Sequence, residues 1–227
     1  MSNTVNLLNG LEFLYPKNKM ISNLKRALHK FPDCETVMVD ALSQGQLKSK
    51  FWLISNLPDG LGTVFVCAGW YGTLANLMFE NIPYKFNKIR SFDIDSSCAS
   101  IAETINRDWV IDGWQFKSST LDILDMDYPT SYVTLRADTS ETTLTENPDT
   151  IINTSCEHIN NFEKWFNRLP AGKLIVLQSN NFSEIEDHVN YCETLKEFSL
   201  TAPMSNILYE GELPLQNYTR FMKIGYK

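Results

Sequence analysis

The stretch at residues 62–77, GTVFVCAGWYGTLANL, constrains the fold more than any other part of the chain. Residues 63–68 are apolar and rich in β-branched and aromatic side chains, which predicts a buried strand. Gly69 and Gly72 then interrupt the run, and residues 73–77 resume with helical character. Glycine permits a positive φ and lets a ligand approach bare backbone. A strand, a glycine-containing turn and a helix in this order therefore predict the first half of a nucleotide-binding βαβ unit.

Strand and helix patterns alternate along most of the chain. Strands are predicted at residues 63–68, 88–94, 114–118, 149–154, 173–177, 206–210 and 218–226, and helices at residues 20–31, 41–57, 73–80, 96–107, 158–169 and 184–198. This alternation predicts an α/β fold: a doubly wound, Rossmann-like seven-stranded sheet that ends in an antiparallel C-terminal hairpin. Residues 1–60 are interpreted as an N-terminal helical extension and residues 61–227 as the Rossmann-like domain.

Two segments give weaker patterns. Residues 34–39 are interpreted as a short extended segment or turn. Residues 129–148 give the least clear pattern: residues 132–136 could form a strand, and residues 137–149 are polar and turn-like, which is interpreted as a surface insertion.

Composition excludes several classes of protein. The chain has 227 residues and a net charge of −7, which argues against a large non-specific nucleic-acid surface. The sequence contains no apolar run near the ~20 residues of a membrane span. The N-terminal residues also lack the charged start and apolar middle of a signal peptide.

The cysteines and histidines argue against a disulfide scaffold and against a metal site. The five cysteines are scattered without CxxC spacing, which is typical of free thiols in a reducing cytoplasm. His29, His158 and His188 are far apart in the sequence, and we therefore predict no metal site.

An acidic residue at the end of the second predicted strand has the sequence separation from the glycine turn that ribose binding requires. Asp93 lies 21 residues after Gly72, and a carboxylate at about 20 residues from such a turn can accept both ribose hydroxyls of a nucleoside. The alternative is a helix-capping role for the helix at residues 96–107, which Ser96 or Ser97 is predicted to begin. We favour ribose binding for Asp93 and assign the helix dipole to Asp95.

Four segments together resemble the class I S-adenosylmethionine-dependent methyltransferases. VFVCAGWYG is similar to the first motif of that family, SFDIDSSCASIAETINR to the second, STLDILDMD to the third and DTIINTSCEHI to the fourth. The resemblance covers about residues 61–180, and the terminal hairpin matches the antiparallel last strand of the family. It implies S-adenosyl-L-methionine as the cofactor and methyl transfer as the reaction.

The resemblance also implies roles for individual residues. The glycine turn would hold the methionine part of the cofactor, Asp93 the ribose, and Asp122 the adenine amino group, while Ile94 and Ile123 would sandwich the adenine. The implied cofactor-binding residues are Ala68, Gly69, Trp70, Tyr71, Gly72, Asp93, Ile94, Asp122, Ile123, Asn153 and Ser155.

The first motif departs from the family pattern. Val66, Cys67 and Ala68 stand where an acidic residue and the first glycine usually lie. The amino group of the methionine part would thus need another partner, such as Asp93, Asn153 or a backbone carbonyl. A second possibility is that the cleft binds a related nucleoside and transfers something else.

Candidate catalytic residues follow the fourth predicted strand. His158 is the best general-base candidate because its ordinary pKa lies near neutrality, and Glu157 could orient it or the acceptor. The alternative is that both simply begin the helix at residues 158–169. Cys156 is a weaker candidate nucleophile, and the Asn180-Asn181 pair could contact an acceptor or form a polar loop.

The methyl acceptor is left open by the sequence. The acidic composition favours a small molecule or a protein over nucleic acid. Two alternatives to methyl transfer stay open: a non-catalytic cofactor-binding or interaction module on the same fold, and an enzyme that cleaves S-adenosylmethionine without an acceptor. Nothing in the sequence indicates the oligomeric state.

Overall fold

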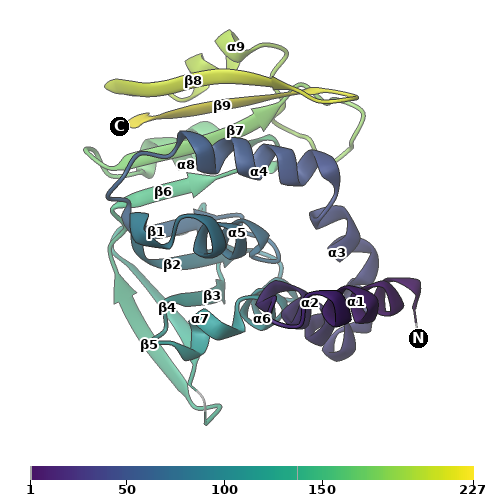
Figure 1. Ribbon diagram of the computed structural model, residues 1–227. Coiled ribbons are helices and arrows are strands. Elements are labelled where there is room, and N and C mark those ends of the chain that lie inside the picture. Colours follow the sequence, from purple (N-terminus) through teal and green to yellow (C-terminus); the bar gives the residue numbers. More distant parts are fainter. Residues whose placement is uncertain (1, 137) are drawn as a thin grey trace.

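A seven-stranded sheet forms the centre of the protein in the computed structural model, which describes residues 2–136 and 138–227 (Figure 1). The strand order is β3-β2-β1-β6-β7-β9-β8. The bounds are β1 Gly62–Cys67, β2 Phe86–Asp93, β3 Phe116–Thr120, β6 Thr150–Asn153, β7 Leu174–Asn180, β8 Asn206–Pro214 and β9 Thr219–Tyr226. Strands β1, β2, β3, β6 and β7 are parallel, whereas β9 is antiparallel to both β7 and β8. The predicted doubly wound sheet with an antiparallel C-terminal hairpin is confirmed.

Helices and 3₁₀ turns connect and cover the strands. The α-helices are α1 Asn3–Leu14, α2 Lys19–Lys30, α3 Glu35–Ala41, α4 Gln44–Asn56, α5 Thr73–Asn81, α6 Cys98–Ile105, α7 Arg107–Ile111, α8 Phe162–Arg168 and α9 Leu195–Thr201. The 3₁₀ turns are η1 Pro32–Cys34, η2 Pro83–Lys85 and η3 Cys156–His158. Among the described residues, no helix combines the length and apolar character that crossing a membrane requires.

Two apolar cores lie on opposite faces of the sheet, and β1 shows why. Val64 and Val66 pack with α4 and α5 on one face, whereas Phe65 and Cys67 pack with α8 and α9 on the other. Because side chains alternate along a strand, a continuous apolar run buries both faces, as a central parallel strand requires.

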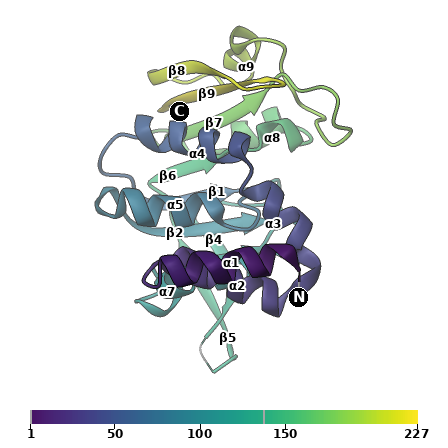
Figure 2. The ribbon, with the colours of Figure 1, turned by 45° about the vertical axis from the view of Figure 1, so that its right-hand side comes forward.

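The N-terminal helices form a third core of their own with the glycine turn. Leu24 and Leu28 of α2 pack with Ile101 and Ile105 of α6, and Tyr71 joins the same cluster. Figure 2 shows α1 and α2 at the front of the molecule, between α7 and α3, and α2 packs against α6. Helix α4 belongs instead to the core on the sheet, so the division at residue 60 stays a prediction.

A hairpin of β4 Thr130–Leu135 and β5 Glu141–Glu146 follows β3. It confirms the possible strand at residues 132–136 and corrects the turn-like insertion expected at residues 137–149, of which residue 137 lies outside the described residues. Alternate β4 residues are buried, and the backbone of β4 is docked beside β3. Lys117 Nζ donates to the Leu135 carbonyl at 2.8 Å, and Ser119 Oγ donates to the Val133 carbonyl at 2.9 Å. The hairpin projects from the β3 side of the sheet in Figures 1 and 2.

Several helix predictions were wrong in detail. Residues 34–39 lie in η1 and α3 rather than in an extended segment, and the helix α1 was not predicted. The helix expected at residues 96–107 is divided between α6 and α7, and α8 begins at Phe162 because η3 occupies the positions before it. The helix expected at residues 184–198 is reduced to α9, which leaves residues 181–194 irregular.

Candidate functional site

The turn after β1 lies directly against the carboxylate that ends β2. The Trp70 N–H donates to Asp93 Oδ2 at 2.8 Å, and the Gly69 N–H donates to the Phe92 carbonyl at 3.0 Å. Strands β1 and β6 neighbour each other, and the chain winds outward from them in opposite directions. This is the topological switch point of the sheet, where open α/β proteins bind their ligands. The predicted convergence of the glycine turn and Asp93 is present.

The glycines serve the turn in two different ways. Gly72 has a φ of 68°, and a Cβ there would lie 2.8 Å from Asn106 Nδ2. Gly69 is required for another reason, because a Cβ there would overlap Ser91 Oγ on β2. The expectation that glycine supplies a positive φ therefore holds at Gly72 alone, while close approach of β2 explains Gly69.

Two non-glycine residues of the turn adopt the left-handed backbone instead. Ala68 has a φ of 54° and Trp70 a φ of 50°. Such conformations cost of order 1–3 kcal/mol each and persist where surrounding contacts enforce them, often at functional sites. The bond from Trp70 N to Asp93 is one such contact.

Asp93 and Asp95 make different contacts: Asp95 lies at the start of α6, as predicted, whereas ribose binding by Asp93 stays a prediction. Burial raises the pKa of Asp93, while the N–H groups of Asp95 and Trp70 partly oppose that rise. Asp95 Oδ1 accepts from the Ser97 N–H at 2.8 Å at the start of α6, which lowers the pKa of Asp95. Ser97 is the N-cap residue, but its side chain makes no capping bond, so the carboxylate of Asp95 supplies the cap.

The other predicted cofactor residues after β1, β2 and β3 differ in exposure. Tyr71 is buried in the N-terminal core, and Trp70 stacks on its ring. Ile94 is 70% exposed, whereas Ile123 is 6% exposed and packs in the core beneath the sheet. Asp122 Oδ1 accepts from the Leu124 N–H at 2.9 Å. The adenine sandwich between the two isoleucines stays a prediction.

Buried polar atoms without partners gather at the same edge of the sheet. Asn153 ends β6 beside Cys67 of β1, and its Oδ1 accepts from the Ser155 N–H at 2.8 Å. Its Nδ2 has no partner, and neither do Ser91 Oγ on β2 and Ser179 Oγ on β7. Buried polar atoms are nearly always paired, so these three are free to bond to a ligand, although unpaired buried atoms such as Trp165 Nε1 also occur away from this edge. The free donor at Asn153 suits a carboxylate such as that of a methionine moiety.

Two hollows of the surface lie away from this edge. One of about 210 Å³ lies between α2 and α7, and one of about 350 Å³ is lined by residues 159–164 and 189–190. Neither of these two is lined by a predicted cofactor-binding residue. The case for a cofactor site thus depends on the convergence of the loops and on their unpaired polar atoms.

A buried ion pair fixes the loop after β6. Glu157 is 2% exposed and Arg220 of β9 is 5% exposed, with Arg220 Nη1 and Glu157 Oε1 2.6 Å apart. Asn180 Nδ2 donates to the same Oε1 at 2.6 Å, and Arg220 Nη2 donates to the Thr154 carbonyl at 2.7 Å. Glu157 Oε2 is buried with no partner. Glu157 is therefore held rigidly by β7 and β9, with one oxygen still available.

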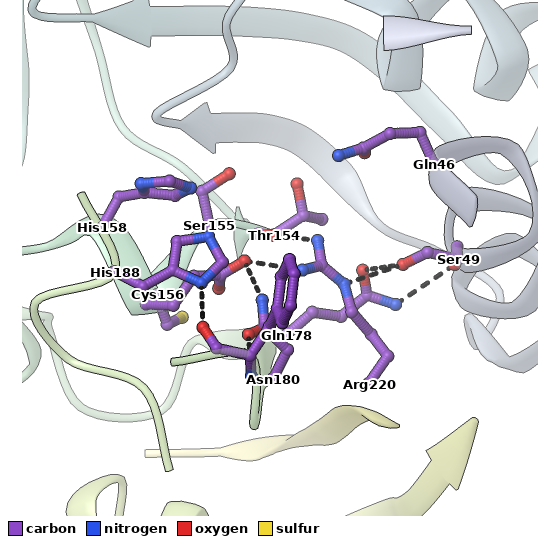
Figure 3. A network of polar contacts seen from close by, with 12 residues as sticks. Gln46, Ser49, Thr154, Ser155, Cys156, His158, Gln178, Asn180, His188 and Arg220 are labelled. Carbon is purple, nitrogen blue, oxygen red and sulfur yellow. Dashed lines mark hydrogen bonds and ion pairs between the residues drawn. The ribbon is translucent and has the colours of Figure 1, made fainter. Parts of the chain in front are cut away.

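The network continues to α4 across the sheet edge (Figure 3). Arg220 Nε donates to Ser49 Oγ at 3.1 Å, and Ser49 Oγ donates to Gln178 Oε1 at 2.9 Å. On the same helix, burial lowers the pKa of Lys50 to about 7, with a further contribution from Arg220. The N-terminal segment thus contributes polar groups to the site.

His158 and His188 lie side by side, although 30 positions separate them in the sequence. Their ring centroids are 4.6 Å apart (Figure 3). His158 Nδ1 lies 3.1 Å from the Asp187 carbonyl and His188 Nδ1 lies 2.6 Å from the Phe182 carbonyl. Since a carbonyl only accepts, both Nδ1 atoms carry a proton, and in the neutral form of each ring Nε2 keeps the lone pair. Desolvation is the main cause that lowers the pKa of His158.

Sequence reasoning missed His188 and Arg220. His188 was placed inside a helix that the structure does not contain. Arg220 was placed in the correct strand, and the one available signal was a charged residue beginning the buried run RFMKIGY. No metal site was predicted because the histidines are far apart in the sequence. In the structure, however, His158 and His188 are neighbours.

Comparison with known proteins yields structural matches only. No protein-family profile matches the chain, and no curated protein sequence matches it. The N-methyltransferase NodS from Bradyrhizobium japonicum WM9 superimposes with a TM-score of 0.60 at 10% identity, over 82% of this chain and 98% of that one. The YcgJ protein from Bacillus subtilis gives 0.57 at 11% identity, over 79% and 98%.

A third match has the cofactor product in its structure. Magnesium protoporphyrin IX methyltransferase from Synechocystis PCC 6803 with bound SAH gives a TM-score of 0.52 at 12% identity, over 92% of this chain and 88% of that one. At such low sequence identities, the similarity establishes the fold alone. The chain has the fold of the class I S-adenosylmethionine-dependent methyltransferases.

Proposed function

We propose that the protein binds S-adenosyl-L-methionine at the switch point between β1 and β6 and transfers its methyl group to an acceptor. The observation that carries this proposal is the bond from Trp70 N to Asp93, which joins the glycine turn and the ribose-binding candidate in one site. Each oxygen of Asp93 accepts one backbone N–H, which leaves a second lone pair on each for ribose hydroxyls. The unpaired Asn153 Nδ2 would receive the methionine carboxylate.

Methyl transfer from a sulfonium requires positioning and, for many acceptors, removal of one proton. His158 would accept that proton at Nε2, because its Nδ1 is engaged by the Asp187 carbonyl. The lowered pKa keeps the ring neutral near pH 7, which is the form that a base needs. Glu157 would act as a positioning residue, since Arg220 and Asn180 hold it in place.

The acceptor class is proposed from charge. With a net charge of −7, the surface suits a small molecule or a protein better than nucleic acid. The five cysteines are all free thiols, which is consistent with a reducing compartment such as the cytoplasm.

Incubation with methyl-labelled S-adenosylmethionine and a cell extract tests the function. Label in an acceptor supports transfer. Tight cofactor binding without label transfer favours a non-catalytic module. The altered first motif is the sequence feature that supports this alternative. Release of cofactor fragments without an acceptor favours cleavage.

Replacing Asp93 tests the site. We expect Asp93→Ala to weaken binding of the demethylated cofactor by more than about tenfold, because hydrogen bonds to a charged acceptor are lost. Asp95→Ala is the matched control: it removes the neighbouring carboxylate that caps α6 and should leave cofactor affinity within about threefold. Isothermal titration calorimetry measures both. Equal affinities of Asp93→Ala and the wild type would show that Asp93 does not bind the ribose.

A further inference from the structure

We propose that Glu157, His158 and His188 form a binding site for a divalent transition-metal ion, with Zn²⁺ the best fit. One ligand atom from each residue can be chosen so that all lie within 4.8 Å of one another. In a tetrahedral zinc site, ligand atoms about 2.0–2.2 Å from the ion lie about 3.4 Å apart. His158 is exposed, so a small rotation of its ring can close the difference.

The free ligand atoms of all three residues are those that a metal needs. His188 and His158 each direct Nδ1 at a backbone carbonyl, at 2.6 and 3.1 Å. Metal-binding histidines characteristically donate their other N–H to a carbonyl or carboxylate, which fixes the ring and leaves the second nitrogen as the ligand. In each ring the carbonyl thus leaves Nε2 free as the ligand atom, and the exposed ring of His158 is the one that must rotate to complete the site.

Glu157 gives a second, independent indication that a cation binds here. Its Oε1 accepts from Arg220 and Asn180, whereas its Oε2 is buried and without a partner. Leaving a buried carboxylate oxygen unpaired is costly, and a cation would remove that cost. Carboxylates that bind metals are usually held in place by hydrogen bonds from neighbouring residues, and the bonds from Arg220 and Asn180 to Oε1 do this for Glu157.

The ligand types select the metal. Two imidazole nitrogens and one carboxylate oxygen suit Zn²⁺ and related first-row ions, whereas Mg²⁺ and Ca²⁺ prefer sets of oxygen ligands. Glu184, Glu186 and Asp187 are exposed on the segment that carries His188 and add negative charge near it.

Three protein ligands leave a fourth position open, as in catalytic zinc sites. Arg220 already neutralises Glu157, so a divalent ion would leave the site with excess positive charge, which favours an anionic oxygen in that position. If the proposed methyl transfer holds, this part of the inference rests on it: the acceptor would be a hydroxyl compound, whose pKa the ion lowers. With the ion bound, the hydroxyl proton would pass to solvent water, and His158 would act as a metal ligand in place of its role as the base.

Metal titration without cofactor tests the site separately from methyl transfer. The chelator-treated full chain is titrated with Zn²⁺ by calorimetry and with Co²⁺ by visible absorption. We expect one saturable ion per chain. His158→Ala, His188→Ala and Glu157→Gln should each weaken binding at least about tenfold. His158→Ala removes an exposed side chain, so its thermal unfolding without metal should match that of the wild type.

The remaining histidine and a nearby thiol supply the controls. His29→Ala on α2 changes an exposed histidine far from the cluster in sequence, and Cys192→Ser removes a buried thiol close to it in sequence; neither should alter the affinity. Absence of saturable binding would overturn the proposal. So would a loss of affinity in His29→Ala or Cys192→Ser equal to that in His158→Ala. Because no S-adenosylmethionine is present, neither result depends on whether the protein transfers methyl groups.

Discussion

Replacing Arg220 by methionine is expected to lower the free energy of unfolding by about 3–5 kcal/mol, the cost of breaking a buried ion pair from one side. The guanidinium and its partner Glu157 are both almost fully buried, with their closest atoms 2.6 Å apart. Methionine keeps most of the side-chain volume, so the loss reports the unpaired Glu157 carboxylate rather than a cavity. Urea denaturation followed by circular dichroism measures it.

Two further variants separate this explanation from a general loss of packing. The double variant Arg220→Met/Glu157→Gln removes both charges of this ion pair and should regain at least about half of the loss. Lys19→Met breaks the exposed pair with Asp108, whose side chains are 63% and 34% exposed, and should cost less than about 1 kcal/mol. If Arg220→Met were no worse than Lys19→Met, the buried network would not hold the loop after β6.

The second large effect is expected at Gly72. Gly72→Ala should destabilise the protein by about 2–4 kcal/mol, because a left-handed φ costs an L-residue about 1–2 kcal/mol and the new methyl group is overpacked. The added Cβ would lie 2.8 Å from Asn106 Nδ2 and 3.1 Å from Ala102 Cβ. Thermal unfolding and cofactor calorimetry on the same sample give stability and affinity.

Gly60→Ala is the matched control for Gly72→Ala. Gly60 has a φ of 73°, yet nothing lies within 4 Å of the position that an added methyl group would take. Its substitution should cost the backbone strain alone, about 1–2 kcal/mol. If both substitutions lowered the free energy of unfolding equally, the packing of the turn against α6 would contribute nothing to stability.

The central strands could be predicted because their signal is local. Residues 64–67 are apolar without interruption, and so are residues 174–177 of β7, which identifies strands buried on both faces. Once those strands are parallel, the loops after them must meet at one edge of the sheet. Asp93, Asn153 and the glycine turn could therefore be placed together from the sequence.

The parts that could not be predicted depend on distant partners. The sequence of β5, ETTLTE, is polar, and its strand forms only because β4 is docked against β3. His188 lies on an irregular segment held by the Phe182 carbonyl and by contacts of Asn190 with the loop after β6. Arg220 of β9 reaches Glu157 in the loop after β6 across the single intervening strand β7. Local periodicity carries no information about such contacts.

Calorimetric titration of the wild-type protein with S-adenosylmethionine, and with its demethylated product, tests the existence of the cofactor site most directly. The account predicts saturable binding of one ligand per chain and a rise in melting temperature that grows with ligand concentration. Failure of both compounds to bind at millimolar concentration would contradict it.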